Sequence, residues 1–235
     1  MRRIRLIVGV ATAVLLCSTV AVAVAEAQVE PNLLGQKGSP PLTFTGSSGV
    51  GTIETASGKK IECVTDSPSG TFEPESGTNL TVTRGPFNIN FETCSLAGIT
   101  CTGSGAGKGV IIVLGTFQLR WWGKAITEHK VAFMALLKEA SFTCGAIKIK
   151  LRGCVAGKVE PVNGGLKSTF SVLFRQEKGK QEITEVFSTG GKETEACKME
   201  LNEGLGFEAA SLATTEALGN FVTHGGETIN VEVMG

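Results

Sequence analysis

The chain of 235 residues contains no tyrosine, a single aspartate (Asp66) and two histidines (His129 and His224). A calcium site normally draws on clustered aspartates and asparagines, which one aspartate does not supply. Nucleophilic hydrolysis needs a histidine beside a serine or cysteine, and no Gly-x-Ser-x-Gly nucleophile elbow occurs here. Both histidines stand in polar, loop-like sequence, which favours an exposed position. We therefore predict no catalytic residue and no cofactor.

The chain also lacks an excess of either charge, with 22 lysines and arginines against 22 aspartates and glutamates. Without residues 1–27 the balance is 19 basic to 21 acidic residues. Nucleic acid requires a concentrated basic surface, so we expect no nucleic-acid partner. Glycoside cleavage needs two carboxylates in an aromatic-lined cleft, and no pair of glutamates stands out in a chain with two tryptophans.

Residues 1–27 have the pattern of a secretory signal peptide. Three arginines lie within the first five residues, an apolar run extends from Leu6 to Ala25, and Ala25-Glu26-Ala27 supplies the small residues of a cleavage site. Ala23-Val24-Ala25 is a second candidate site. The apolar run is also about long enough to cross a bilayer, so an uncleaved membrane anchor is the alternative. In both cases we predict that the remainder is secreted into an extracellular, oxidising space.

Six cysteines remain after cleavage, because Cys17 lies within the signal segment. An even number in an exported chain predicts three disulfides. The run between Cys144 and Cys154 alternates like an extended strand, so its ends lie farther apart than the Cα atoms of a disulfide. We therefore expect that these two cysteines do not pair with each other. Between Cys94 and Cys101 a glycine allows the chain to turn back and close a small loop, which leaves four cysteines for two long-range bridges. The six cysteines are Cys63, Cys94, Cys101, Cys144, Cys154 and Cys197.

A metal site is the alternative use of these cysteines. No Cys-x-x-Cys pair occurs, and both histidines lie far from the cysteines in the sequence, so we expect no metal. The glycine-rich residues 102–109 resemble a phosphate-binding loop only at first sight. Thr102 and Gly109 stand where a P-loop requires a glycine and a hydroxyl residue, so we interpret this stretch as a turn.

Most of the remaining chain consists of short segments that alternate between apolar and polar residues or are rich in β-branched residues. Such strands, separated by glycine-rich turns, predict an all-β fold, an antiparallel β-sandwich or barrel-like domain stapled by disulfides. We expect residues 28–42 to be a flexible leader and residues 43–235 to form a single β-rich domain. The predicted strands are Val50–Thr55, Lys60–Val64, Asn79–Thr83, Phe87–Thr93, Val110–Trp122, Ile147–Arg152, Leu166–Gln176, Gln181–Phe187, Cys197–Asn202 and Thr228–Val233.

Two further segments, Val131–Ala140 and Ala209–Leu218, fit a helix as well as a strand. Because strands surround them, we interpret the first as a buried strand and leave the second open. The clearest predicted hairpin joins Phe170–Gln176 to Gln181–Phe187 through a turn at Glu177–Lys180.

Four groups of short stretches, three of them with cysteines, are Gly51-Thr-Ile-Glu-Thr with Ile61-Glu-Cys63, Phe91-Glu-Thr-Cys94 with Cys101, Phe142-Thr-Cys144-Gly145, and Val159-Glu-Pro161-Val162-Asn163. Together they resemble a group of uncharacterised secreted bacterial proteins with no assigned activity. The recurrent cysteines of that group correspond to Cys63, Cys94, Cys101 and Cys144. Cys154 and Cys197 depart from the pattern together, so the resemblance favours pairing Cys154 with Cys197. It then leaves Cys63 with Cys144, beside the local pair of Cys94 with Cys101, and it transfers no catalytic residue.

The adjacent residues Trp121 and Trp122 are the most suggestive binding feature. Neighbouring residues on a strand point to opposite faces, so both rings are buried only if both faces are covered. We therefore expect one exposed indole beside Arg120 and Lys124, as a contact point for a sugar, a lipid headgroup or a protein. The alternative is a ring that caps a loop at the end of the domain.

The sequence thus predicts a secreted, non-catalytic domain that serves as an extracellular or cell-surface interaction module, with an unknown protein or glycan partner. Two alternatives remain: an extracellular hydrolase with an unrecognised site, and a carrier that holds a small apolar ligand between its sheets. A cleft that gathers His129 or His224 with a serine and a glutamate would favour the hydrolase. A large apolar cavity would favour the carrier.

Overall fold

The computed structural model describes residues 30–35, 41–74, 81–188 and 194–235, so the predicted signal peptide lies outside the described residues. Their helical structure is a single 3-10 turn, Ile126–Glu128, and all other regular elements are strands. Among these residues we find no helix capable of crossing a membrane. The predicted all-β fold class is confirmed.

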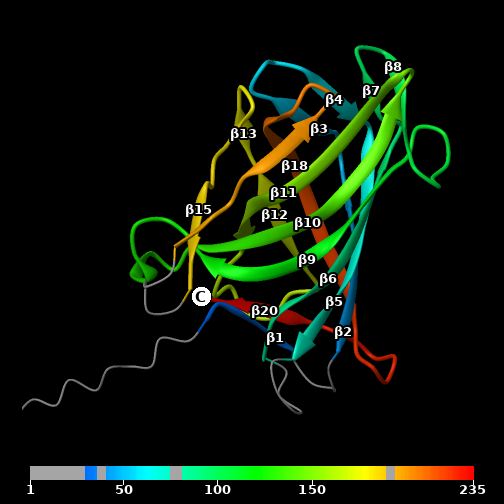
Figure 1. The fold of residues 1–235 in the computed structure, drawn as a ribbon. Coiled ribbons are helices and arrows are strands. Elements are labelled where there is room, and N and C mark those ends of the chain that lie inside the picture. Colours follow the sequence, from blue (N-terminus) through cyan, green and yellow to red (C-terminus); the bar gives the residue numbers. More distant parts are fainter. Residues whose placement is uncertain (1–29, 36–40, 75–80, 189–193) are drawn as a thin grey trace, which may run out of the picture.

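Eight strands form a closed antiparallel barrel (Figure 1). Each of the eight pairs with the one that follows it among these eight in the sequence. The ring closes where the last strand returns to the first, in a ladder that sets Ala217 opposite Ser47. Closure leaves no free edge in this ring. Of the two predicted arrangements, sandwich and barrel, the chain adopts the barrel. The strands of the ring are β2 (Leu42–Ser48), β5 (Thr65–Pro74), β6 (Thr81–Glu92), β9 (Ile111–Trp121), β10 (Val131–Cys144), β11 (Ile147–Glu160), β12 (Thr169–Phe174) and β18 (Phe207–Val222).

Shorter strands complete a second ring on top of the first. β10, β11 and β18 are 14, 14 and 16 residues long and take part in both rings. The upper ring runs from β18 through β3, β4, β7 and β8 to β10, and β17 lies between β11 and β18. Both rings share one hydrophobic core. The added strands are β3 (Gly51–Thr55), β4 (Lys60–Cys63), β7 (Ser95–Leu96), β8 (Ile99–Gly103) and β17 (Met199–Asn202).

Strands near the two ends of the described chain close the lower end of the barrel (Figure 1). β1 pairs with both β20 and β6, and Leu33 of β1 is fully buried in the core. The predicted flexible leader over residues 28–42 therefore contains a strand, because one of its leucines packs inside the barrel. The strands at this end are β1 (Asn32–Gly35), β19 (Thr228–Ile229) and β20 (Val231–Met234).

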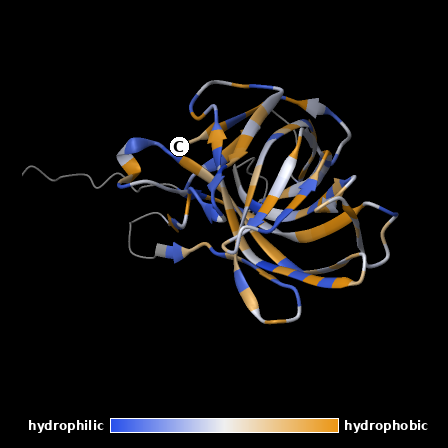
Figure 2. Ribbon diagram, turned by 90° about the horizontal axis from the view of Figure 1, so that it is seen from above, coloured by the Kyte–Doolittle hydropathy of each residue, from blue (hydrophilic) through white to orange (hydrophobic). Residues whose placement is uncertain are grey.

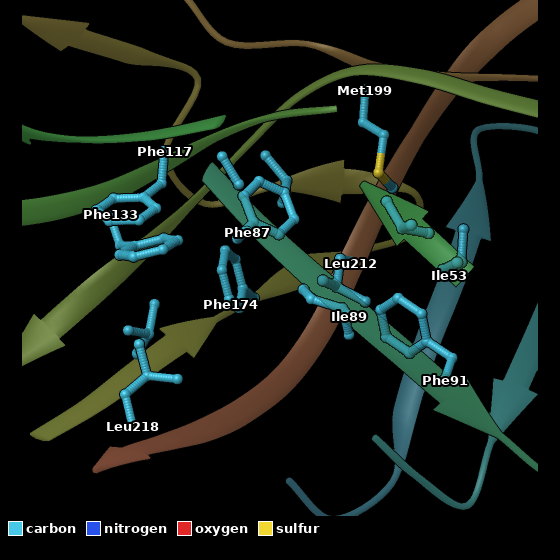
Figure 3. Close-up of a cluster of buried hydrophobic side chains, with 14 of the residues drawn as sticks. Ile53, Phe87, Ile89, Phe91, Phe117, Phe133, Phe174, Met199, Leu212 and Leu218 are labelled. Atoms are coloured by element: carbon cyan, nitrogen blue, oxygen red, sulfur yellow. The ribbon is translucent and has the colours of Figure 1, made fainter. Parts of the chain in front are cut away.

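The barrel interior is filled by aromatic and aliphatic side chains (Figure 3). Alternate residues of β9 point inward and are buried, while their neighbours face out, a striping that is visible along the strands in Figure 2. Phe117 lies at the centre, stacked on Phe133 at a centroid distance of 4.6 Å and edge-on to Phe72 at 4.7 Å. Inward glycines make room for such rings, since a Cβ at Gly115 would lie 2.6 Å from the Phe87 ring.

A second, smaller core lies on the outside of the barrel. Ala132 and Met134 of β10 and Cys154 and Ala156 of β11 face outward, yet they are buried because the chain between β12 and β17 crosses over them. Both faces of β10 are therefore covered at its start. This explains why Val131–Leu137 is a continuous apolar run rather than an alternating one. The covering strands are β13 (Gln176–Glu177), β14 (Lys180–Gln181), β15 (Glu185–Phe187) and β16 (Thr194–Ala196).

The strand interpretation of Val131–Ala140 is confirmed, and the open segment Ala209–Leu218 also forms a strand, as part of β18. The predicted hairpin of Phe170–Gln176 with Gln181–Phe187 is wrong for most of its residues. Only β13 and β14 pair across its turn, because β12 is held between β11 and β18 in the barrel wall.

Three disulfides join the six predicted cysteines, but only one of the favoured pairs is correct. Cys154 pairs with Cys197, as the resemblance implied. This bridge fastens the chain between β12 and β17, which we call the covering segment, to β11. The other bridges are Cys63–Cys94 and Cys101–Cys144, so the favoured pairs Cys94 with Cys101 and Cys63 with Cys144 are wrong.

The tight turn between Cys94 and Cys101 does form, as the hairpin of β7 and β8, and the Cys101 amide donates to the Cys94 carbonyl oxygen. Cys101, however, lies directly opposite Cys144 across the β8–β10 ladder, with the two Cα atoms 4.0 Å apart. Cys94 lies equally close to Cys63 at the end of β4. Neighbouring strands of the upper ring, rather than the local turn, thus decide the pairing.

We expect the double variants Cys154→Ala/Cys197→Ala and Cys101→Ala/Cys144→Ala to lose similar stability. Both bridges join residues 43 positions apart, so each restricts the unfolded chain by the same amount, about 4 kcal/mol. Urea unfolding of the two variants and the parent measures this. If a variant had the same midpoint of urea unfolding as the parent, the bridge that it removes would be contradicted.

Replacing Phe117 by alanine should destabilise the protein by about 3–5 kcal/mol, because it empties the centre of the aromatic core. Leu114→Ala on the same strand is the matched control, since Leu114 faces outward and is 47% exposed. Its cost should stay below about 1 kcal/mol. Equal losses in thermal or urea unfolding would show that the two side chains are not on opposite faces of the wall.

Candidate functional site

The two adjacent tryptophans at the end of β9 point to opposite faces, as predicted. Trp121 points into the barrel and is 3% exposed. Trp122 points outward and is half-buried, because it packs against the small outer core. The expected exposed indole is therefore only partly accessible, since the segment that crosses β10 and β11 covers one side of it.

Trp122 borders a surface hollow of about 450 Å³ at the lower end of the barrel. One wall comes from the turn after β9, with His129 and Lys130, and the other from the end of β11, with Lys158 and Glu160. Val131, Val159, Pro161 and Val162 form the apolar remainder of the lining. The hollow thus combines a ring face, an imidazole and charged groups of both signs.

The charged groups of the hollow are paired with one another. Lys130 lies over the Trp122 ring at 5.1 Å from its centroid and forms an ion pair with Glu128. The hydrogen bond from Lys130 lowers the pKa of Glu128 below its ordinary 4.5. On the opposite wall, Lys158 is paired with Glu160. The hollow therefore offers hydrogen-bond donors and acceptors without a strong net charge.

His129 is held in place by the last described residue. Its Nδ1 lies 2.9 Å from the Gly235 carbonyl oxygen, which also accepts a hydrogen bond of 2.8 Å from Asn163. A carbonyl oxygen only accepts, so Nδ1 is the donor and carries the hydrogen. The neutral imidazole then has Nε2 as an acceptor. This arrangement fixes the orientation of the ring at the rim of the hollow.

The other predicted binding residues do not line this hollow. Arg120 is half-buried on the outer face of β9 and forms ion pairs of 3.5 Å with Glu30 and 3.6 Å with Glu195. Lys124 is exposed in the turn after β9, and its backbone amide donates to Glu128. Of the predicted binding residues, Trp122 therefore borders the hollow. Arg120 instead links Glu30, near the start of the described chain, to Glu195 in the covering segment.

The second histidine, His224, is exposed in the turn between β18 and β19, apart from the hollow. Within the described part of the chain, no group of three or more histidine, cysteine, aspartate or glutamate side chains is arranged to hold a metal ion.

Among the described residues, the interior of the barrel contains a narrow void of about 30 Å³, lined by apolar side chains and by Glu216. A water molecule occupies a similar volume in the liquid, about 30 Å³, whereas ligand pockets are typically about 300–1,000 Å³. This void, formed by described residues, is therefore too small for a ligand of ordinary size.

Two carboxyl groups are buried in the barrel, and one of them, that of Glu216, lines this void. Asp66 and Glu216 are each 2% exposed. Burial, followed by the neighbouring Asp66 carboxyl, raises the pKa of Glu216 from 4.5 to about 9. Burial also raises the pKa of Asp66 above its ordinary 3.8, although hydrogen bonding to Glu216 and Ser48 acts in the opposite direction.

This pair was not predicted from the sequence. Asp66 stood out only as the single aspartate of the chain. The signal for Glu216 is its position in the alternating series Leu212, Thr214, Glu216 and Leu218, which places a carboxyl on the inward face of a strand. The segment was ambiguous between helix and strand, so that inward position was not recognised.

No protein-family model, curated protein or solved structure matches this chain. The resemblance to uncharacterised secreted bacterial proteins stays a prediction.

The two tryptophans should respond differently to an external quencher. The chain has no tyrosine, so a Trp121→Phe variant reports on Trp122 alone and Trp122→Phe reports on Trp121 alone. We expect acrylamide to quench Trp122 more strongly, because Trp121 is 3% exposed. Equal quenching in two folded variants would contradict the placement of the rings.

Proposed function

We propose that this protein is a secreted, non-catalytic β-barrel that binds an extracellular glycan in the hollow beside Trp122. The observation that carries the proposal is the contrast between this hollow of about 450 Å³ and the interior void of about 30 Å³. Binding is therefore expected on the outer surface of the barrel rather than inside it.

The chemistry of the hollow favours a polyhydroxylated ligand. A partly exposed indole provides an apolar face for a sugar ring, and the polar groups around it supply both donors and acceptors. An anionic ligand would compete with Glu128 and Glu160 for the lysines. A protein partner usually needs a flat surface that buries about 1,600 Å² in total, whereas this site is concave and small.

Secretion is part of the proposal and rests on two features. Three disulfides are typical of an oxidising compartment. The predicted signal peptide, residues 1–27, fits the same compartment.

The alternatives have less support. His129 would serve as a catalytic base only through Nε2, and the lining of the hollow includes no serine or cysteine as a nucleophile. A carrier of an apolar ligand would have to expand its interior, which is filled by packed rings.

The proposal is tested on a glycan array, followed by titration of any positive glycan against variants. Trp122→Ala and Lys158→Ala should each weaken binding about tenfold or more, because the first removes the stacking face and the second removes a polar contact. Lys124→Ala is the matched control, as an exposed lysine outside the hollow, and should bind like the parent.

An array without any binding, or binding that is equal in the parent and both variants, would contradict the proposal. Capture of one defined protein through the same residues would replace the glycan by a protein partner. Cleavage products in a mass spectrum of the incubated glycan would contradict a non-catalytic role.

A further inference from the structure

The buried carboxyl pair lies at the point where the barrel closes. Asp66 is on β5 and Glu216 is on β18, the two strands that flank β2. Glu216 is opposite Ser48, the last residue of β2, and the Thr65 hydroxyl donates to the Ser48 carbonyl oxygen at 2.9 Å. We call the contact of β2, β5 and β18 around Ser48 the closure seam.

Neither carboxyl group has a cationic partner among the described residues. Their four oxygens are almost completely inaccessible, and none accepts a hydrogen bond of normal geometry, although the Ser48 and Thr214 hydroxyl groups are near enough to act on the pair. Two buried negative charges without such partners would be strongly unfavourable. One proton between them turns Glu216 into a hydrogen-bond donor to Asp66 and removes one of the charges.

The groups that act on the pair from the surrounding strands are acidic or neutral. Glu92 on β6 raises the pKa of Asp66 through its charge. Ser48 on β2 lowers the pKa of Asp66, and Thr214 on β18 lowers that of Glu216, both through their hydroxyl groups. The void beside Glu216 is otherwise apolar and lacks the oxygen ligands that a calcium or magnesium ion requires. A proton is therefore the ligand that suits this site.

We infer that Asp66 and Glu216 form a proton-binding site that keeps the closure seam shut while one proton is shared and weakens it when that proton leaves. The proton moves from the Glu216 carboxyl oxygen to water, and two facing carboxylates remain. Their repulsion acts on the strands that close the ring. The site makes the barrel less stable as the pH rises, independently of ligand binding at Trp122.

The direction of the pH effect follows from linkage. The folded protein holds the proton up to a pH of about 9, whereas an unfolded glutamate releases it near its ordinary pKa of 4.5. The folded state therefore binds more protons between these values, and stability falls as the pH rises through that window. The steepest change is about tenfold in the unfolding equilibrium constant per pH unit for one proton.

The experiment is urea unfolding of the disulfide-intact protein at several values between pH 5 and pH 9. The parent should lose stability steadily as the pH rises. Glu216→Gln should flatten this loss and exceed the parent's stability at pH 9, since the amide cannot ionise. Glu54→Gln is the matched control, because Glu54 is also buried but is paired with Gln176 at 2.7 Å and Lys60 at 3.6 Å. It should keep the parent's pH dependence.

Infrared spectroscopy of the folded parent at pH 7 provides a second measurement that does not need the variant to be stable. It should show the carbonyl stretch of a protonated carboxylic acid, and this band should disappear at alkaline pH. Asp66→Asn serves in place of Glu216→Gln if the latter does not fold. A parent whose stability is equal at pH 5 and pH 9, a Gln variant with the parent's slope, or the absence of the infrared band would overturn the inference.

Discussion

The pairing of β2 with β18 is the interaction on which the rest of the structure depends. It joins strands that lie at opposite ends of the sequence, with Ser47 opposite Ala217, and converts a meandering sheet into a closed ring. Closure satisfies the backbone groups of what would otherwise be two edge strands. It also creates the single interior in which the phenylalanine rings pack, and it brings Asp66 and Glu216 together from strands on either side of β2.

The filled interior is the reason why the proposed binding site lies on the outer surface. Inward glycines such as Gly70 and Gly115 accept the rings of Phe44 and Phe87, so the barrel is packed rather than hollow. The covering segment, fastened by Cys154–Cys197, buries one side of Trp122 and leaves the other beside the hollow. In the proposed function, the core that stabilises the barrel and the surface that binds the glycan are therefore separated in space. The aromatic core holds the barrel, while Trp122 and the paired lysines shape its outer site.

The sequence was sufficient for features that depend on local alternation, and insufficient for those that depend on closure. Alternation along Val110–Trp122 predicted β9 and the opposite directions of Trp121 and Trp122. The partner of Cys101 was missed because it depends on which strand becomes a neighbour in the upper ring. His129 was recognised only as a surface residue, since its contact with Gly235 joins distant parts of the chain. Glu216 was missed because its strand was ambiguous.

The most direct test of the account is to detect the closing ladder by nuclear Overhauser effects in the folded protein. The closed barrel requires contacts between backbone protons of β2 and β18, at the pairs Ser47–Ala217 and Thr45–Gly219. It also requires contacts between β2 and β5, at the pair Thr43–Thr71. Observation of both sets would establish closure. If β2 showed contacts to β5 but none to β18, the sheet would be open, and the shared interior and the carboxyl pair would both be contradicted.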